Sequence, residues 1–286
     1  MKNNIKIGAH VSIAGGLSNA ITNAQAIGAD CFQIFSGAPQ MWGRKKYTEK
    51  ELAEFKDLVA ENNLNPVFVH APYLPNICTD KPENLEKSII ALTSELKFVH
   101  AIGAEGLIVH LGSHLGQGFE NVKEQVIDSI VEIYEKSGFN TKFVLENSSG
   151  KTNVVGANFE EIGEIISSLK SKHNVDVDVC LDTAHMFASG YDIRTKESVQ
   201  KVLDDLKKTK VLDRAVCLHV NDSKVDLGTG NDRHENIGEG FIGSEGFKHF
   251  FSFEEFKNLP MILEVPGFTG NGPDIKNLEI LRSLVF

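Results

Sequence analysis

The sequence predicts an α/β fold, a single (β/α)8 TIM barrel that spans residues 1–286. Short apolar runs rich in β-branched residues alternate with longer segments of helical period, which is the pattern of repeated βα units. No composition break, Pro-rich linker or low-complexity tract separates them, and the units share no motif that would indicate a solenoid. The eight expected strands are residues 5–9, 31–35, 67–70, 107–110, 143–146, 177–182, 215–219 and 261–264.

Helical segments are expected between the strands. After Asp80-Lys81-Pro82, which offers a cap with a proline just inside, apolar residues recur at spacings of four and three until Gly103, so one helix face is apolar. Residues 17–28 form the first expected helix. The remaining helices are expected to start near Thr48, Glu120, Asn158, Glu197, Ser244 and Pro273.

The composition is that of an ordinary globular protein. Of 286 residues, 41% are hydrophobic and 24% charged, and no long uncharged apolar stretch or amino-terminal leader is apparent, so we expect a cytoplasmic protein and, by default, a monomer. The four cysteines lie far apart without a CxxC pair and are expected to be buried hydrophobes. A net charge of −10 argues against a broad electrostatic surface for nucleic acid. Bound divalent cations would offset part of that charge.

Six of the eight expected strands end on a residue that can bind a metal. In a (β/α)8 barrel the carboxyl ends of the strands form the working face, so these side chains are expected to meet. A single histidine at a strand end is more often a hydrogen-bonded structural group, but six such residues together favour a metal site. Their mixture of imidazole and carboxylate suits Zn²⁺, Mn²⁺ or Fe²⁺. The six are His70, His110, Glu146, Asp182, His219 and Glu264.

Three further candidates follow strands: His185, and the alternating pair Asp232 and His234, which an extended loop would point the same way. A second cluster is therefore predicted. The other five histidines are not expected to be ligands. His100 and His249 fall in helices, His173 in a polar connection, and His10 and His114 near the working face without a partner pattern.

Other local signals carry less weight. The GxGxxG match at residues 238–243 is interpreted as a turn, because it does not open a helix directly after a strand. No GxSxG, P-loop or HExxH sequence occurs. Trp42, Tyr73 and the basic run Arg44-Lys45-Lys46 lie in loops of the working face, where they either pin the loops or grip a nucleic-acid strand.

Along essentially its whole length the sequence resembles the endonuclease IV family of abasic-site endonucleases. The motifs that carry the resemblance are GAHVS at 8–12, HAPYLPN at 70–76, HLGSH at 110–114, EN at 146–147, CLDTAH at 180–185, HVNDSK at 219–224, DRH at 232–234, GEG at 238–240 and LE at 263–264.

The resemblance implies three zinc ions per chain, with Mn²⁺ or Fe²⁺ as alternatives at some positions. His70, His110 and Glu146 would hold the first. Glu146 would bridge to a second held by Asp182, His219 and Glu264, and His185, Asp232 and His234 would hold the third. Glu146 and Glu264 are the expected catalytic residues, Glu146 to position the first two ions and Glu264 to take up the proton of the nucleophile.

The implied reaction is hydrolysis of the phosphodiester 5′ to an abasic site in double-stranded DNA, which leaves a 3′-hydroxyl and a 5′-deoxyribose phosphate. Blocked 3′ ends would also be trimmed, and the protein would associate with the nucleoid when acting on DNA. Tyr73 and Trp42 are candidates for supporting the bent strand. The loop after the second strand carries Gln40 about where the family often places an arginine that enters the DNA.

Two other functions remain open. A sugar isomerase or epimerase on a related barrel would use one divalent ion, which fits Glu146, Asp182, His219 and Glu264 but gives His185 and the Asp232-Arg233-His234 segment no role. A non-catalytic, metal-stabilised DNA-binding protein would need fewer ligands than this working face offers. The number of bound metals separates the isomerase from the nuclease.

Overall fold

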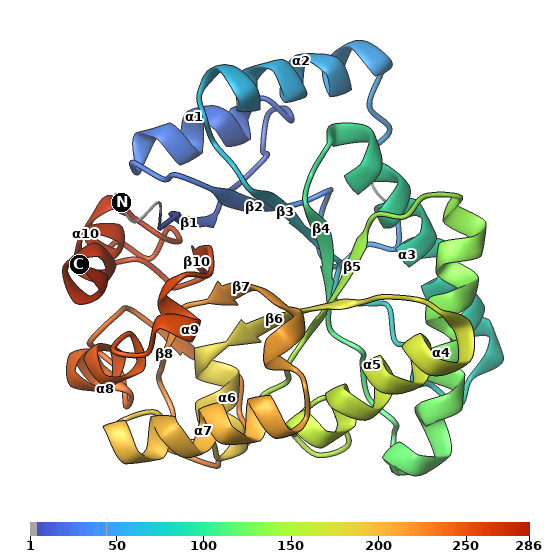
Figure 1. The fold of residues 1–286 in the computed structure, drawn as a ribbon. Coiled ribbons are helices and arrows are strands. Elements are labelled where there is room, and N and C mark those ends of the chain that lie inside the picture. The colour runs from blue at the N-terminus through green and yellow to red at the C-terminus, as the bar shows by residue number, and fades with distance from the viewer. Residues whose placement is uncertain (1–4, 44) are drawn as a thin grey trace.

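Eight parallel strands close into a barrel in the computed structural model, which describes residues 5–43 and 45–286. The strand order around the barrel is β1-β10-β7-β6-β5-β4-β3-β2 (Figure 1), so the predicted fold class is confirmed. His110 and Glu264 lie one residue beyond their strands. The barrel strands are β1 Ile7–His10, β2 Phe32–Phe35, β3 Val67–His70, β4 Gly106–Val109, β5 Lys142–Glu146, β6 Asp178–Asp182, β7 Ala215–His219 and β10 Met261–Leu263.

Helices follow the strands and surround the barrel. They are α1 Asn19–Ala26, α2 Glu49–Glu61, α3 Pro82–Ile102, α4 Phe119–Ser137, α5 Phe159–His173, α6 Thr183–Ser189, α7 Lys196–Lys208, α8 Gly243–Phe250, α9 Glu254–Lys257 and α10 Ile275–Val285, with a short 3-10 helix at Leu212–Arg214. All eight predicted helices are present. The short helices α6 and α9 and the two-residue strands β8 (Asp222–Ser223) and β9 (His234–Glu235), which pair antiparallel, were not predicted.

Two local predictions about helix ends are wrong. Asp80 does not cap α3, because the capping position is Lys81, which makes no side-chain cap hydrogen bond, and Pro82 begins the helix. His173 is the last residue of α5 instead of part of a connection. At Thr48 and Asn158, near which helices were expected to start, the side chain caps the helix and accepts a hydrogen bond from a backbone N–H of the first turn.

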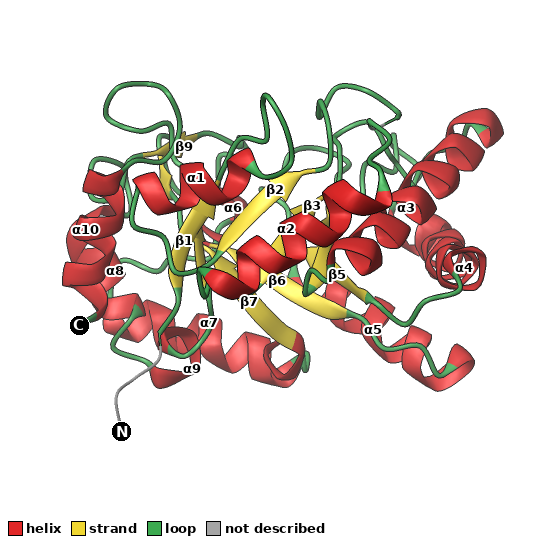
Figure 2. Ribbon diagram, turned by 90° about the horizontal axis from the view of Figure 1, so that it is seen from above, coloured by secondary structure: helices red, strands yellow, loops and turns green. Residues whose placement is uncertain are grey.

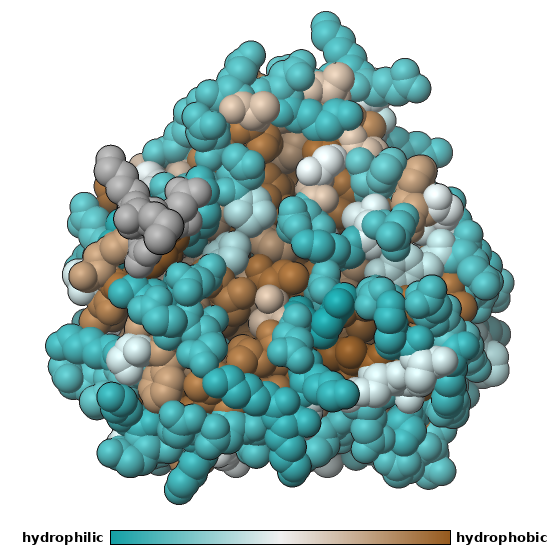
Figure 3. Space-filling model, in the orientation of Figure 1, coloured by the Kyte–Doolittle hydropathy of each residue, from teal (hydrophilic) through white to brown (hydrophobic). Residues whose placement is uncertain are grey.

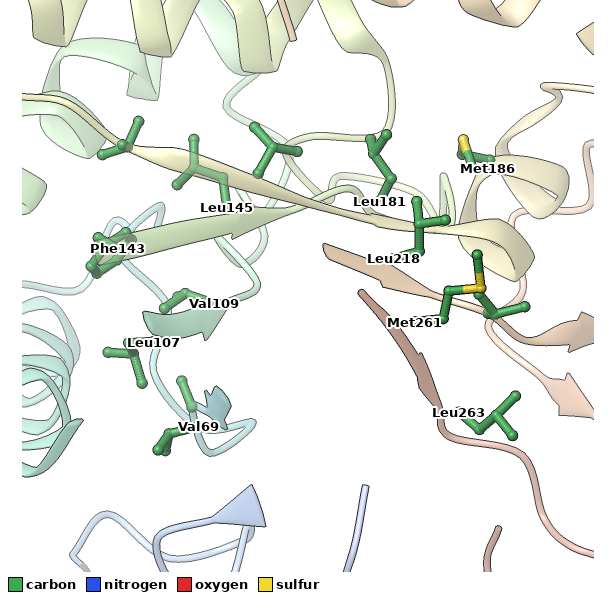
Figure 4. Packing of buried hydrophobic residues seen from close by; sticks show 14 of the residues in the cluster. Val69, Leu107, Val109, Phe143, Leu145, Leu181, Met186, Leu218, Met261 and Leu263 are labelled. Atoms are coloured by element: carbon green, nitrogen blue, oxygen red, sulfur yellow. The ribbon is translucent and has the colours of Figure 1, made fainter. Parts of the chain in front are cut away.

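Successive side chains along each barrel strand point alternately into two buried layers, one outside and one inside the barrel. Figure 4 shows residues such as Val69, Leu107 and Leu145 in the layer that packs between the strands and the helices. Their neighbours belong to a separate small cluster inside the barrel. That inner cluster consists of Phe68, Ile108, Val144, Cys180 and Cys217. Because side chains alternate along a strand, a residue two positions after each inner residue also points into the barrel, nearer its carboxyl end.

Long loops gather at the carboxyl end of the strands, along the upper edge of Figure 2, together with β9. Figure 3 views the other end, where hydrophilic side chains cover the periphery and hydrophobic ones show toward the middle. Within the described residues, none of the helices has the length and apolar character needed to span a bilayer. Because the carboxyl ends of all the barrel strands lie at the loop-rich end, polar side chains from different strands can meet there.

Candidate metal centre

The six strand-end residues predicted as ligands all lie two positions after an inner barrel residue. His70 follows Phe68, His110 follows Ile108, and Glu146 follows Val144. The same spacing places Asp182 after Cys180, His219 after Cys217, and Glu264 after the buried Ile262. Alternation thus points all six into one end of the barrel. Their donor atoms fall into compact groups, within each of which the atoms lie within 4.8 Å of one another.

The first group contains His70, His110 and Glu146. The Nε2 atoms of His70 and His110 lie 3.1 and 3.3 Å from the same carboxylate oxygen, Oε2 of Glu146. His70 Nδ1 lies 2.7 Å from the carbonyl oxygen of Ala71, so it is the nitrogen that carries the proton. His70 Nε2 is therefore the nitrogen left to bind an ion beside Glu146.

The second group contains Glu146, Asp182, His219 and Glu264. Nδ1 of His219 lies 2.8 Å from Glu146 Oε1, 3.2 Å from Glu264 Oε2 and 3.8 Å from Asp182 Oδ2. Glu146 thus offers one oxygen to each of the first two groups. His219, Glu146 and Asp182 are fully buried, whereas the Glu264 side chain is 17% exposed.

The third group depends on α6 and on the loop that follows β8. Asp182 ends β6 and caps α6, where its Oδ1 accepts a hydrogen bond of 2.8 Å from the backbone N–H of His185. The tight turn holds the His185 ring beside the barrel end, with Nε2 3.3 Å from Asp232 Oδ2. Nε2 of His234 lies 3.2 Å from Asp232 Oδ1 and 3.8 Å from Asp182 Oδ2. The donor atoms of Asp182, His185 and His234 form the compact group here, and Asp232 contacts both histidines, so the predicted trio meets.

The charge of the cluster fits cations. Within the described chain, the ion pairs of Glu146, Asp182, Asp232 and Glu264 are made with histidines alone. Burial would raise the pKa of Glu146, but the neighbouring imidazoles, His110 and His219 first, hold its pKa well below the ordinary value. Burial would likewise lower the pKa of His185, yet the nearby carboxylates raise it to about 10. Such crowded carboxylates need positive charge nearby.

His234 contributes a buried ring nitrogen to the third group. Among the described residues, His234 Nε2 finds no hydrogen-bonding partner although Asp232 Oδ1 lies 3.2 Å away, and His234 Nδ1 lies 3.2 Å from the carbonyl oxygen of Glu264. An orphaned buried nitrogen that faces carboxylates is the arrangement expected of a metal ligand. Imidazole nitrogens combined with carboxylate oxygens suit Zn²⁺, Mn²⁺ or Fe²⁺, so the residues present fit such ions.

Sequence reasoning missed two residues of this cluster, His10 and Gln33. His10 Nδ1 lies 3.4 Å from Glu264 Oε1, and the Gln33 side chain, which is fully buried, contacts both Glu264 and His219. Both residues lie on neighbouring barrel strands as direct partners in the β1–β2 register. The available signal was a polar residue two positions after Gly8 or Cys31, directly after the first expected strand or inside the second.

The loop that carries Asp232 and His234 is fastened by Asp222. The Asp222 carboxylate is fully buried and accepts hydrogen bonds of 3.0 Å from the backbone N–H groups of Gly238, Gly240 and Ile242. A Cβ at Gly240 would lie 2.5 Å from Asp222 Oδ1, so a side chain there would disrupt this close approach. The GxGxxG segment is therefore a turn, as predicted, and it wraps around a carboxylate.

The loops after β2 and β3 lie against each other beside the cluster. The backbone N–H of Tyr73 donates to the carbonyl oxygen of Pro39, and the Tyr73 ring packs edge-on against His70 at 5.9 Å between centroids. Tyr73 is 61% exposed and Trp42 39% exposed, and Gln40 is also exposed. Arg44 of the basic run lies outside the described residues. This end of the barrel thus presents aromatic surface next to the first group.

Two cavities flank the cluster. One, of about 750 Å³, lies between the loops after β1 and β2 and is lined by His10, Phe35 and Lys45 among others. The other, of about 340 Å³, is lined by His110, Asp232, Arg233 and Lys151. Each cavity therefore joins the cluster of carboxylates and imidazoles to at least one cationic side chain.

Comparison with known proteins gives a consistent picture. Residues 21–284 match the family described as xylose isomerase-like TIM barrel. Probable endonuclease 4 of Petrotoga mobilis is 41% identical over 267 residues, which cover 92% of each chain. Probable endonuclease 4 of Halothermothrix orenii is 37% identical over 278 residues, 97% of this chain and 99% of the relative.

Two solved structures are similar to this chain at different levels of sequence identity. The crystal structure of endonuclease IV from Thermus thermophilus is similar with a TM-score of 0.86 at 32% identity, covering 98% of each chain. The crystal structure of a D-tagatose 3-epimerase-like protein has a TM-score of 0.72 at 18% identity, covering 98% of this chain and 97% of that one. At that identity the second likeness shows the fold alone.

Replacement of Asp222 by Asn should destabilise the protein. The new amide NH₂ would face backbone N–H donors in place of a carboxylate oxygen, so we expect a loss of about 2–4 kcal/mol in the free energy of unfolding, measured by denaturant titration. Asp226→Asn, in the same loop at a side chain that is 63% exposed, is the matched control and should unfold like the wild type. Equal unfolding curves for both variants would show that Asp222 does not fasten the loop.

Proposed function

The chain belongs to the endonuclease IV family, and we propose that it is a zinc-dependent DNA repair hydrolase that cuts the phosphodiester 5′ to abasic sites. The resemblance read from the sequence motifs is confirmed by full-length relatives at 37–41% identity. The products would be a 3′-hydroxyl and a 5′-deoxyribose phosphate, and the same chemistry would trim blocked 3′ ends. A single domain acting as a monomer in the cytoplasm, on double-stranded DNA, is part of the proposal.

The observation that carries the proposal is the extent of the candidate ligand set. Nine side chains gather at one barrel end in a chain that is similar throughout to proteins named endonuclease 4. The rival function, a sugar isomerase or epimerase, needs one ion held by about four ligands. It gives no role to the contacts among His185, Asp232 and His234, and the likeness to epimerase structures shows the fold alone.

The proposed ligand assignment follows the three groups. His70, His110 and Glu146 would hold one ion, and Glu146, Asp182, His219 and Glu264 a second. His185, Asp232 and His234 would hold the third, with Asp182 close enough to take part. We propose Zn²⁺ at all three positions, with Mn²⁺ or Fe²⁺ as substitutes at some of them.

When bound, divalent ions in such a site activate water, neutralise phosphoryl oxygens and help the leaving oxygen to depart. The reaction forms a bond between the water oxygen and phosphorus and breaks the bond between phosphorus and the 3′ oxygen. Glu146 is completely buried and would position the first two groups relative to each other. Glu264 is partly exposed and adjoins both His10 and His219, so it is our candidate to accept the proton of the attacking water.

Selectivity for an abasic site is proposed to arise from extrusion of the baseless sugar toward the cluster. Extrusion costs less for such a sugar than for a paired, stacked base. Tyr73, Trp42 and Gln40 lie exposed on adjacent loops, where they would support the distorted strand, Gln40 in place of an arginine. Lys45, Lys151 and Arg233 line the flanking cavities, where phosphates would pass. This local positive charge would matter in a chain of net charge −10.

The proposed activity can be tested by incision of a labelled duplex with one synthetic abasic site. We expect a single cut 5′ to the lesion, no cut in the intact duplex, and loss of cutting after chelation that added Zn²⁺ restores. Metal analysis of the same sample should give about three ions per chain. Three bound ions without incision would reject the nuclease, and about one ion per chain would favour the isomerase.

Glu146→Gln should remove the carboxylate shared by the first two groups. We expect a folded protein that binds about one ion per chain in place of three and cuts at least about 100-fold more slowly, because a carboxamide is a poor bridging ligand. Elemental analysis and single-turnover incision measure the two effects. Glu132→Gln, on the exposed side of α4, is the control. Normal cutting by Glu146→Gln would refute the assignment.

Tyr73→Ala should chiefly weaken binding of lesion DNA. Loss of one stacking ring corresponds to roughly 1–3 kcal/mol, or about a 5–150-fold rise in Kd, which fluorescence anisotropy with an abasic duplex would measure. Tyr73→Phe keeps the ring and should bind nearly as the wild type does. An unchanged affinity of Tyr73→Ala would remove Tyr73 from the DNA surface.

A further inference from the structure

Gln33 is the only amide side chain among the inward-facing residues of the described barrel strands. It lies in the middle of β2 and is fully buried, where an unsatisfied amide would cost free energy. Its Oε1 lies 2.8 Å from His219 Nε2. Its Nε2 lies 2.7 Å from Glu264 Oε1 and 2.9 Å from His10 Nδ1. Every polar atom of the Gln33 amide therefore contacts the cluster.

These contacts are consistent with only one orientation of the amide. A carboxylate oxygen only accepts hydrogen bonds, so the atom of Gln33 that faces Glu264 must be the NH₂ group. The carbonyl oxygen Oε1 then faces His219 and requires a proton on Nε2 of that ring. The second hydrogen of the NH₂ group requires Nδ1 of His10 to act as an acceptor. The three hydrogen bonds thus determine each other's direction.

The arrangement leaves the inner atoms of both partners directed at the second group. With a proton of His219 fixed on Nε2, Nδ1 is the nitrogen that faces Glu146 and Asp182, and it can bind an ion once its own proton has been displaced. With Glu264 Oε1 held by Gln33, Oε2 is the oxygen 3.2 Å from His219 Nδ1. We propose that Gln33 is a positioning residue of the metal centre, which holds His219 and Glu264 in the orientation that binds the second ion.

Other imidazoles of the cluster are oriented by backbone. His70 uses the carbonyl oxygen of Ala71, His185 that of Asn147, and His234 that of Glu264. A substitution does not remove a carbonyl oxygen. His219 differs because its outer nitrogen is held by a side chain, so its orientation can be changed by one mutation. This inference rests on the proposed metal assignment, and not on the identity of the substrate.

Gln33→Met tests the proposal, because methionine has a similar length and no hydrogen-bonding group that could replace the amide. Zinc retention is measured by elemental analysis after equilibration with increasing chelator, without DNA. We expect one of three ions to be lost at about 10–100-fold lower chelator concentration than in the wild type, and the other two to be retained. Gln25→Met, on the exposed surface of α1, is the matched control and should retain zinc like the wild type.

Gln33→Glu keeps the acceptor for His219 but cannot donate to Glu264, and it provides a second test if Gln33→Met fails to fold. It should also lose one ion early, because a second carboxylate would face Glu264. The proposal is overturned if the folded variants retain zinc like the wild type, or if all three ions are lost together. Wild-type protein that holds three ions but does not cut DNA would reject the proposed function and leave the role of Gln33 intact.

Discussion

The closed parallel barrel imposes the constraint on which the site depends. The carboxyl ends of all eight parallel strands lie at one end of the barrel. Because side chains alternate in direction along a strand, each strand has an inward-facing residue there. In this chain every one of the eight positions carries a polar or charged side chain, two residues after an inner residue that is apolar, cysteine or glycine. The eight are His10, Gln33, His70, His110, Glu146, Asp182, His219 and Glu264.

Burying these eight inward-facing side chains, the inward ring, costs free energy unless cations are bound. Three of the eight side chains are carboxylates, those of Glu146, Asp182 and Glu264, which lie close together with histidines as ion-pairing partners, and burial alone would favour neutral acids. Instead the imidazoles hold the pKa of Glu146 down while the carboxylates raise the pKa of His234 to about 9 against the effect of its burial. Protons on the imidazoles thus supply positive charge where the proposed ions would, and binding an ion must displace them.

The candidate ligands at the strand ends could be predicted because the signal lies within a few residues of the sequence. In each case an apolar run ends at a residue that can bind a metal, such as His70 or Glu146. His10 was left out because it follows the expected strand of residues 5–9 and showed no partner pattern, although it ends β1. Gln33 was missed because only the last residue of each run was considered, whereas the inward position of β2 lies two residues before its end. Applying the alternation to all eight strands would have found both. The grip of Asp222 on the loop could not be predicted, since it joins residues up to 21 positions apart through backbone groups.

The inward ring and the third group are carried by different parts of the fold. The ring belongs to the barrel, a fold shared with epimerase structures at 18% identity or less among the solved structures compared. His185 comes from the short helix α6, and Asp232 and His234 come from a loop that Asp222 fastens to the barrel. In TIM barrels the chemistry changes mainly through such loops, while the strands are kept. The group most specific to the proposed phosphodiester cleavage is therefore expected to be the one that depends least on the barrel itself.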